Sequence, residues 1–104
     1  MRLVPVLLAC AALLSSSPYA FAATDVPAEG TYGFDWLKNP NSTQCVAVTK
    51  ALIKKFRKCE LTDGSFGGDP AKARKCAIDK RSEYMVYESK EACAKALETE
   101  KANE

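Results

Sequence analysis

The cysteines are the feature that most limits how this chain can fold. Four of the five cysteines lie beyond residue 22, at Cys45, Cys59, Cys76 and Cys93. They are too widely spaced for the close cysteine pairs of a structural zinc site, and the chain has no histidine to complete one. An even number of cysteines in a small exported domain predicts two disulfides instead.

The N-terminus predicts export. Residues 1–22 have the pattern of a secretory signal peptide: Arg2, an apolar run over 3–14, and Ala-Phe-Ala at 20–22 as the cleavage site. An alternative is a lipoprotein signal ending at Cys10. The apolar run is shorter than the roughly 20 residues that cross a bilayer. We therefore expect a periplasmic or secreted protein with no transmembrane span in the mature chain.

The remainder of the chain is expected to form one small domain. Residues 23–40 are predicted as an N-terminal arm and aromatic segment, and residues 41–104 as a single domain with two disulfides. The aromatic segment, which includes Trp36, is expected to fold as a lid over the core, with an exposed contact patch as the alternative. Each disulfide would contribute about 2–4 kcal/mol, which is comparable with the net stability of such a domain.

A helix is predicted between the first two cysteines, over residues 43–59. Apolar residues recur there at spacings of three and four, and the polar residues opposite them are basic, with no acid between Gln44 and Cys59. Asn41 or Ser42 would be its N-cap. A continuous helix would hold Cys45 and Cys59 roughly 21 Å apart, whereas a disulfide needs Cα atoms within about 7 Å. Each must therefore bond to another element.

The second half of the chain predicts an irregular loop, two strands and a second helix. Residues 60–70 contain three glycines and Asp-Pro, which indicates a loop. Residues 74–78 and 83–88 are predicted as the strands of a hairpin. Ser89 would cap a helix over residues 90–102 whose buried stripe is Cys93, Ala96 and Leu97. The fold class is α+β, in the order helix, long loop, β-hairpin, helix; the alternative is an all-α domain of three short helices.

Two disulfide pairings are compatible with this order. If the first strand runs back along the first helix, Cys45 pairs with Cys76 and Cys59 with Cys93, which is the pairing we favour. If the loop turns the chain differently, Cys45 pairs with Cys93 and Cys59 with Cys76.

Several activities are disfavoured by the absence of their motifs. Without histidine there is no Ser-His or Cys-His pair for nucleophilic catalysis. The cysteines are not in C-x-x-C spacing, which redox catalysis would favour. The Gly67-Gly68 pair is not followed by Gly-Lys-Ser/Thr, so no nucleotide site is expected. We expect a non-catalytic protein that needs no metal or cofactor.

Binding functions remain. The first hypothesis is a small interaction protein, such as an inhibitor or accessory binding module, that contacts another protein through Phe66 and Trp36. The second is a binder of anionic surfaces or polyanions through the basic face of the first helix, at Lys50, Lys54, Arg57 and Lys58. Against it stands an ordinary solvated face whose charge is balanced by the glutamate-rich C-terminal helix. An envelope-stress chaperone is a third hypothesis, although no pH switch near neutrality is evident without histidine.

Overall fold

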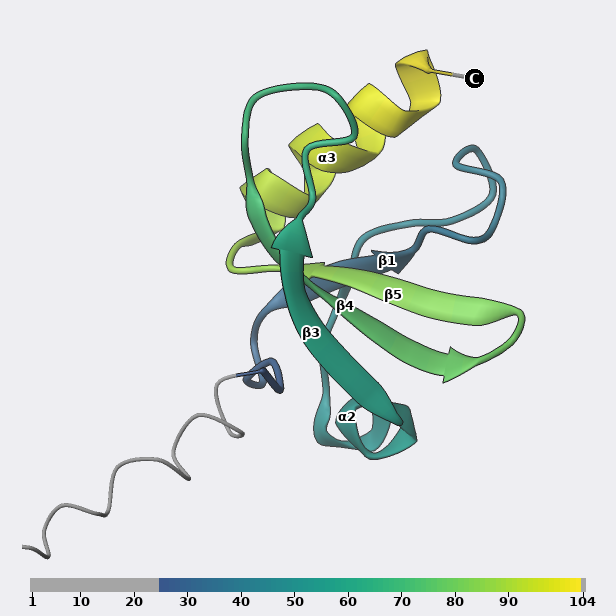
Figure 1. Cartoon of the computed structure of the whole chain (residues 1–104), viewed down its shortest axis with the longest axis vertical. Coiled ribbons are helices and arrows are strands. Elements are labelled where there is room, and N and C mark those ends of the chain that lie inside the picture. The colour runs from purple at the N-terminus through teal and green to yellow at the C-terminus, as the bar shows by residue number, and fades with distance from the viewer. Residues whose placement is uncertain (1–24, 104) are drawn as a thin grey trace, which may run out of the picture.

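The computed structural model describes residues 25–103, so the leader predicted at residues 1–22 lies outside the described residues. The described chain forms an antiparallel five-stranded sheet in the order β2-β1-β5-β4-β3, with two helices (Figure 1). The elements are β1 Tyr32–Asp35, β2 Val46–Ala47, α2 Lys50–Lys55, β3 Lys58–Asp63, β4 Lys72–Asp79, β5 Ser82–Tyr87 and α3 Lys90–Ala102. A small α+β domain with two disulfides is therefore the correct class, and the all-α alternative is wrong.

The prediction of one long helix over residues 43–59 is wrong. Only Lys50–Lys55 is helical; Val46–Ala47 lies in β2 before it and β3 begins at Lys58 after it. Thr49 is the N-cap in place of Asn41 or Ser42, and its hydroxyl accepts a hydrogen bond from the Leu52 amide at 3.2 Å. A short helix gains little from its own hydrogen bonds, so strand pairing on both sides decides where it ends.

The predicted aromatic lid is an inner strand instead. β1 lies between β2 and β5, with Phe34 opposite Met85, so it belongs to the same sheet as the segment after residue 40. Its pattern is weak because Gly33 interrupts it, and glycine is depleted in strands. The glycine is needed there, since a Cβ atom would lie 2.8 Å from the Met85 carbonyl oxygen.

The predicted loop at residues 60–70 is also partly wrong, because β3 continues to Asp63. β3 pairs only with β4 and forms one edge of the sheet. β4 and β5 pair with each other around a turn at Lys80–Arg81. The sequence of elements is thus not helix, loop, hairpin and helix, because three strands precede the pair formed by β4 and β5.

The C-terminal helix is confirmed. α3 spans Lys90–Ala102, the Ser89 hydroxyl accepts a hydrogen bond from the Ala92 amide at 3.1 Å, and the buried residues are Cys93, Ala96 and Leu97. Such a cap satisfies one of the free amides of the first turn. This helix could be predicted from its own segment because the capping residue and the apolar stripe indicate the same helix.

The disulfides join Cys45 to Cys93 and Cys59 to Cys76. Our favoured pairing is therefore wrong and the alternative is correct. The reason is the position of β3: it pairs with β4 in a register that sets Cys59 directly opposite Cys76, which leaves the other two cysteines to each other. The two disulfides indicate an oxidising compartment.

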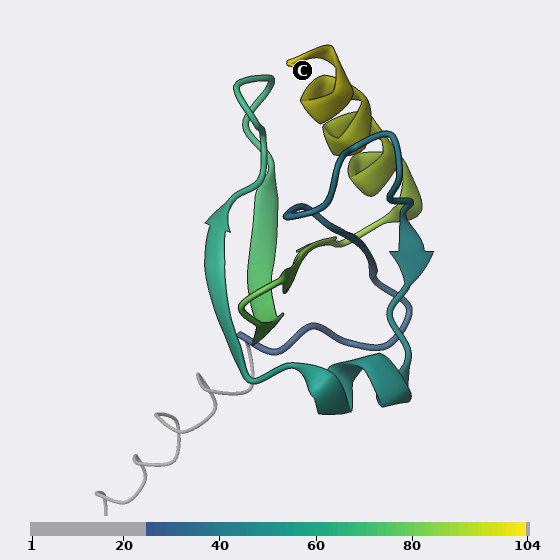
Figure 2. The same ribbon diagram turned by 90° about the vertical axis from the view of Figure 1, so that its right-hand side faces the viewer.

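The sheet carries a hydrophobic cluster on each face. The first cluster packs against α3 and contains Phe34, Met85 and Tyr87. The second packs against α2 and contains Val48, Cys76 and Val86. Residues of β5 alternate between the two clusters, as successive residues of a strand must. Figures 1 and 2 both place α3 and α2 at opposite ends of the molecule.

The loop between β3 and β4 is held by several contacts. The buried Tyr87 hydroxyl donates a hydrogen bond to the Gly64 carbonyl at 2.6 Å, and the Asn103 side-chain amide donates one to the Phe66 carbonyl at 2.8 Å. The Asp63 carboxylate accepts from the Ala71 amide at 3.3 Å and from both the amide and the hydroxyl of Ser65 at 3.1 Å. The loop therefore presents a defined conformation at the α3 end.

The Asp63 contacts predict a pH dependence of stability. The hydrogen bond from the Ala71 amide, followed by that from the Ser65 hydroxyl, lowers the pKa of Asp63. A carboxyl with a lowered pKa in the folded state stabilises the fold above its unfolded pKa of about 4, and this contribution disappears as the pH falls through the folded value. We expect Asp63→Asn to unfold at lower urea concentration than wild type at pH 6. The difference should close as the pH falls below about 4, as measured by urea titrations between pH 2 and pH 7. A difference that stays constant over this range would contradict the prediction.

Candidate functional site

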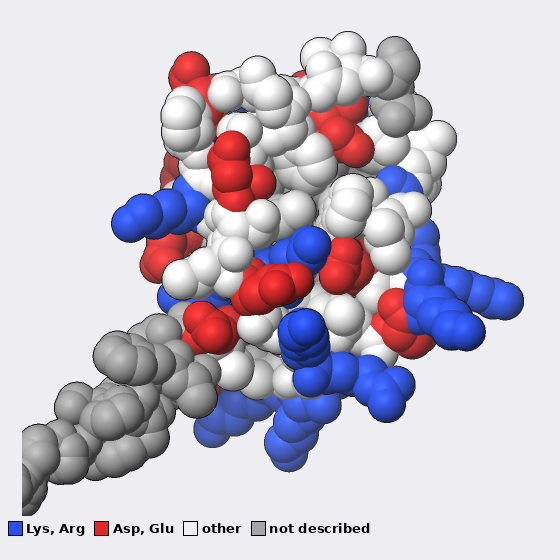
Figure 3. Space-filling view, in the orientation of Figure 1, with Lys and Arg blue, Asp and Glu red and all other residues white. Residues whose placement is uncertain are grey.

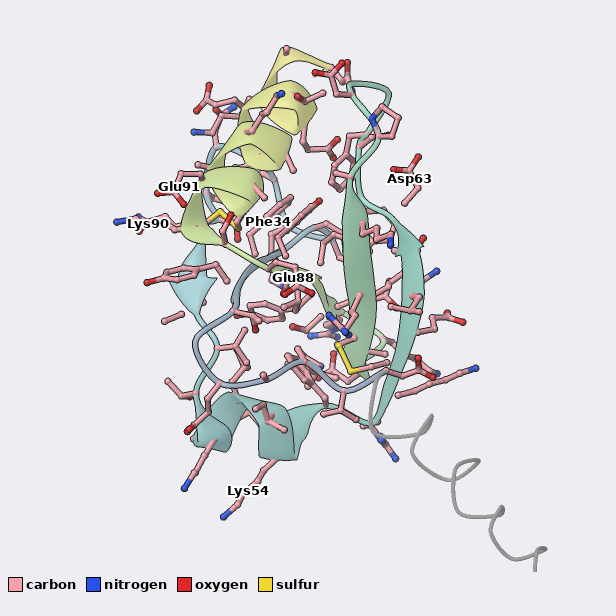
Figure 4. The ribbon with its side chains drawn as sticks, turned by 90° about the vertical axis from the view of Figure 1, so that its left-hand side faces the viewer. Phe34, Lys54, Asp63, Glu88, Lys90 and Glu91 are labelled. Carbon is pink, nitrogen blue, oxygen red and sulfur yellow. A yellow bond between two sulfur atoms is a disulfide. The ribbon has the colours of Figure 1, made fainter. Side chains whose placement is uncertain are left out.

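The candidate binding residues fall into two separate groups. Trp36 and Phe66 pack beside the first cluster, and the four basic residues lie on or directly after α2. In Figure 4, Phe34 of the first cluster lies near the base of α3, whereas Lys54 projects from the opposite end of the molecule. The six residues do not form one site.

The aromatic group is engaged in packing. The Phe66 ring centroid lies 5.8 Å from that of Phe34 and 6.3 Å from that of Trp36. The Trp36 indole nitrogen donates a hydrogen bond to the Glu83 carboxylate at 2.9 Å. Phe66 also adopts a left-handed backbone conformation, with φ of 52°, which costs a non-glycine residue free energy. Its ring and carbonyl contacts explain how that conformation is maintained.

The basic group is exposed. Lys50, Lys54 and Lys55 project from α2, and Arg57 and Lys58 follow at the start of β3. The opposite side of the same segment is apolar: Leu52, Ile53 and Phe56 pack against the second cluster. The amphipathic pattern that we interpreted as one long helix therefore does place the basic side chains in solvent and the apolar side chains in the core. Helix α2 covers only part of that segment.

The β4–β5 turn carries two further exposed cations, which the sequence pattern did not single out as candidates. The Arg57 amide donates a hydrogen bond to the Ala77 carbonyl at 2.8 Å, which fixes the end of α2 beside the end of β4. Exposed Lys80 and Arg81 follow three and four residues after Ala77. Their only signal in the sequence was a polar turn. We define the basic end as the following seven residues: Lys50, Lys54, Lys55, Arg57, Lys58, Lys80 and Arg81.

Between residues 25 and 103, no side chain of the basic end lies within ion-pair distance of a carboxylate. The glutamate-rich α3, which we considered as the balancing charge, lies at the other end of the molecule and forms its own ion pairs, Lys95–Asp69 at 3.1 Å and Lys101–Glu98 at 3.4 Å. Figure 3 shows lysine and arginine atoms along the lower edge of the molecule, around α2. The balance by α3 that we expected is absent from the described residues.

Three hollows lie elsewhere, close to the loop between β3 and β4. Their volumes are about 360, 330 and 410 Å³, and Lys72 lines all of them. The first is bounded by Ala92 and Ala96 of α3 and by the Lys95–Asp69 ion pair. No residue of the basic end lines any of these three hollows.

Within the described residues, no group of three or more histidine, cysteine or acidic side chains could hold a metal ion. The same part of the chain has no helix that is long and apolar enough to cross a membrane. Comparisons with protein-family models, with curated proteins and with solved structures gave no match.

Proposed function

We propose that this protein is an exported, non-catalytic interaction protein that docks its basic end onto an anionic partner. The observation that carries the proposal is the group of seven exposed cations without an ion-pair partner in residues 25–103. Surface charges of one sign attract an oppositely charged partner and increase its rate of association. Export to the periplasm or to the medium is supported by the leader pattern and by the two disulfides.

The distribution of charge favours the basic end over the aromatic residues. Five of the 15 lysines and arginines lie between Lys50 and Lys58, where the sequence has no acid, so the remaining chain has more acidic than basic residues. Trp36 and Phe66 are half-buried and already have partners within the fold. Binding through them would require these contacts to be given up, whereas binding through the basic end requires no rearrangement.

The proposal predicts salt-dependent association with the cell envelope. We expect the protein to associate with envelope preparations of an exporting host at 50 mM salt and to be released at about 0.5 M, because salt screens exposed charges over distances of a few ångströms. The triple variant Lys54→Gln, Lys55→Gln, Lys58→Gln should lose most of this association. A matched variant, Lys90→Gln, Lys95→Gln, Lys101→Gln, removes the same charge from α3 and should retain it.

Sedimentation of envelopes at several salt concentrations, followed by immunodetection of the bound protein, measures the association. Equal binding of both triple variants, or binding that is indifferent to salt, would exclude the basic end as the docking surface.

A further inference from the structure

The identity of the anionic partner can be inferred from the shape and composition of the basic end. We propose that the partner is the surface of an anionic phospholipid bilayer, which the protein binds peripherally. This inference rests on the proposed function and names the chemistry that the basic end recognises: phosphate-bearing headgroups spread over a plane.

The basic end has no apolar centre. The apolar residues of its segment, Leu52, Ile53 and Phe56, pack inward on the second cluster. The large hydrophobic residues that are exposed in the described chain belong to other segments: Val26, Leu37, Val46 and Leu61. Stable interfaces between proteins have an apolar core surrounded by a polar rim, with charged residues depleted at the core. Asp79 places one exposed carboxylate beside Lys80, but cations dominate this surface and it lacks an apolar core, so an acidic protein is a poor occupant.

The three hollows described above do not provide the basic end with a groove for a linear polyanion. The three hollows lie near Lys72, toward α3, and none of them is lined by α2 or by the β4–β5 turn. Proteins that bind single-stranded nucleic acid combine a basic groove with exposed aromatic rings. Here Phe56, the aromatic residue nearest to these cations in sequence, packs on Tyr84 with ring centroids 6.0 Å apart. An exposed basic surface that lies outside these hollows is suited to a planar partner.

Lysine dominates the basic end, at five positions out of seven. Lysine is a flexible point charge, whereas arginine is preferred where a planar group is bound at two points. Flexible point charges can follow mobile headgroups without a fixed geometry. Clustered lysines and arginines near an anionic membrane each strengthen binding by about five-fold, so the five cations from Lys50 to Lys58 are sufficient for peripheral attachment without an inserted segment.

The test uses the processed protein recovered from an exporting host, with its N-terminus and both disulfides verified by mass spectrometry. It is sedimented with sucrose-loaded vesicles of phosphatidylcholine, or of phosphatidylcholine with 30% phosphatidylglycerol, at 50 mM salt. We expect binding to the anionic vesicles only. The Lys54, Lys55 and Lys58 triple glutamine variant should bind about 100-fold more weakly, and the α3 triple variant should bind as wild type does. Circular dichroism of each variant verifies its fold.

The remaining measurements distinguish anionic lipid from other negatively charged partners. Inorganic phosphate at 10 mM, with ionic strength held constant, should not compete, because the headgroups act as a surface. If heparin fragments bind tightly while anionic vesicles do not, the lipid inference is wrong and the anionic docking surface is retained. If envelope association depends on the three lysines but lipid vesicles fail to bind, the lipid inference is again wrong. If neither envelopes nor vesicles bind, both proposals are wrong.

Discussion

Replacing Cys45 and Cys93 together by alanine is expected to lower the free energy of unfolding by about 4 kcal/mol, and replacing Cys59 and Cys76 by about 3 kcal/mol. The cross-links close loops with sequence separations of 48 and 17 residues. The longer loop restricts the unfolded chain more, so its loss costs more. Each disulfide includes one cysteine with no exposed area, Cys93 in the first cluster and Cys76 in the second. The cavity left behind should therefore be similar in the two variants.

Urea unfolding of the two double variants, followed by circular dichroism, measures this difference. The wild-type protein in reducing buffer is the control for loss of both bonds, and on these values we expect it to be largely unfolded. A lower free energy of unfolding for the Cys59–Cys76 variant would contradict this prediction. The cross-strand bond would then stabilise the fold mainly through the sheet and the second cluster, and loop length would not determine the difference.

Replacing Phe34 by alanine is expected to cost about 3–5 kcal/mol. Phe34 has no exposed area, and its ring is stacked on Tyr87 with centroids 6.2 Å apart and 5.8 Å from the ring of Phe66. Removing it takes away buried apolar area and leaves a cavity at the centre of the first cluster. The Phe66 ring would lose the neighbour that helps to hold its left-handed backbone.

Phe56 offers a matched control, because it is also a phenylalanine but is half-buried beside the second cluster. The Phe56→Ala variant should lose less stability than the Phe34→Ala variant, because Phe56 is partly exposed and its ring removes less area from water. Denaturant midpoints of the two variants compare them directly. Equal losses would mean that the first cluster is not the main source of stability.

The elements that could be predicted from the sequence are those coded locally. Ser89 and the stripe of Cys93, Ala96 and Leu97 lie within one segment, and α3 has the predicted bounds. β1 could not be predicted, because Gly33 weakens its pattern and its requirement for glycine comes from Met85, far along the chain. The disulfide pairing was open for the same reason, since it depends on the register between β3 and β4.

The candidate site was predictable in part. The cations between Lys50 and Lys58 stand out because no acid separates them. Their extension to Lys80 and Arg81 depends on the hydrogen bond from Arg57 to Ala77, which joins segments that the sequence does not relate. Phe66 could be either an anchor of the loop or a protruding contact residue, because a single aromatic residue among glycines gives no indication of which way its ring turns; its ring packs on Phe34.

The alternation of β5 between the two clusters makes the sheet sensitive to strand slippage. A shift of one residue would turn Met85 and Tyr87 toward α2, and Val86 toward α3, so both clusters would be lost together. The Cys59–Cys76 bond joins two directly opposed residues of β3 and β4. It therefore fixes the register of β3 against β4 covalently, whereas the register of β5 against β4 depends on strand pairing and on the packing of its side chains in the two clusters.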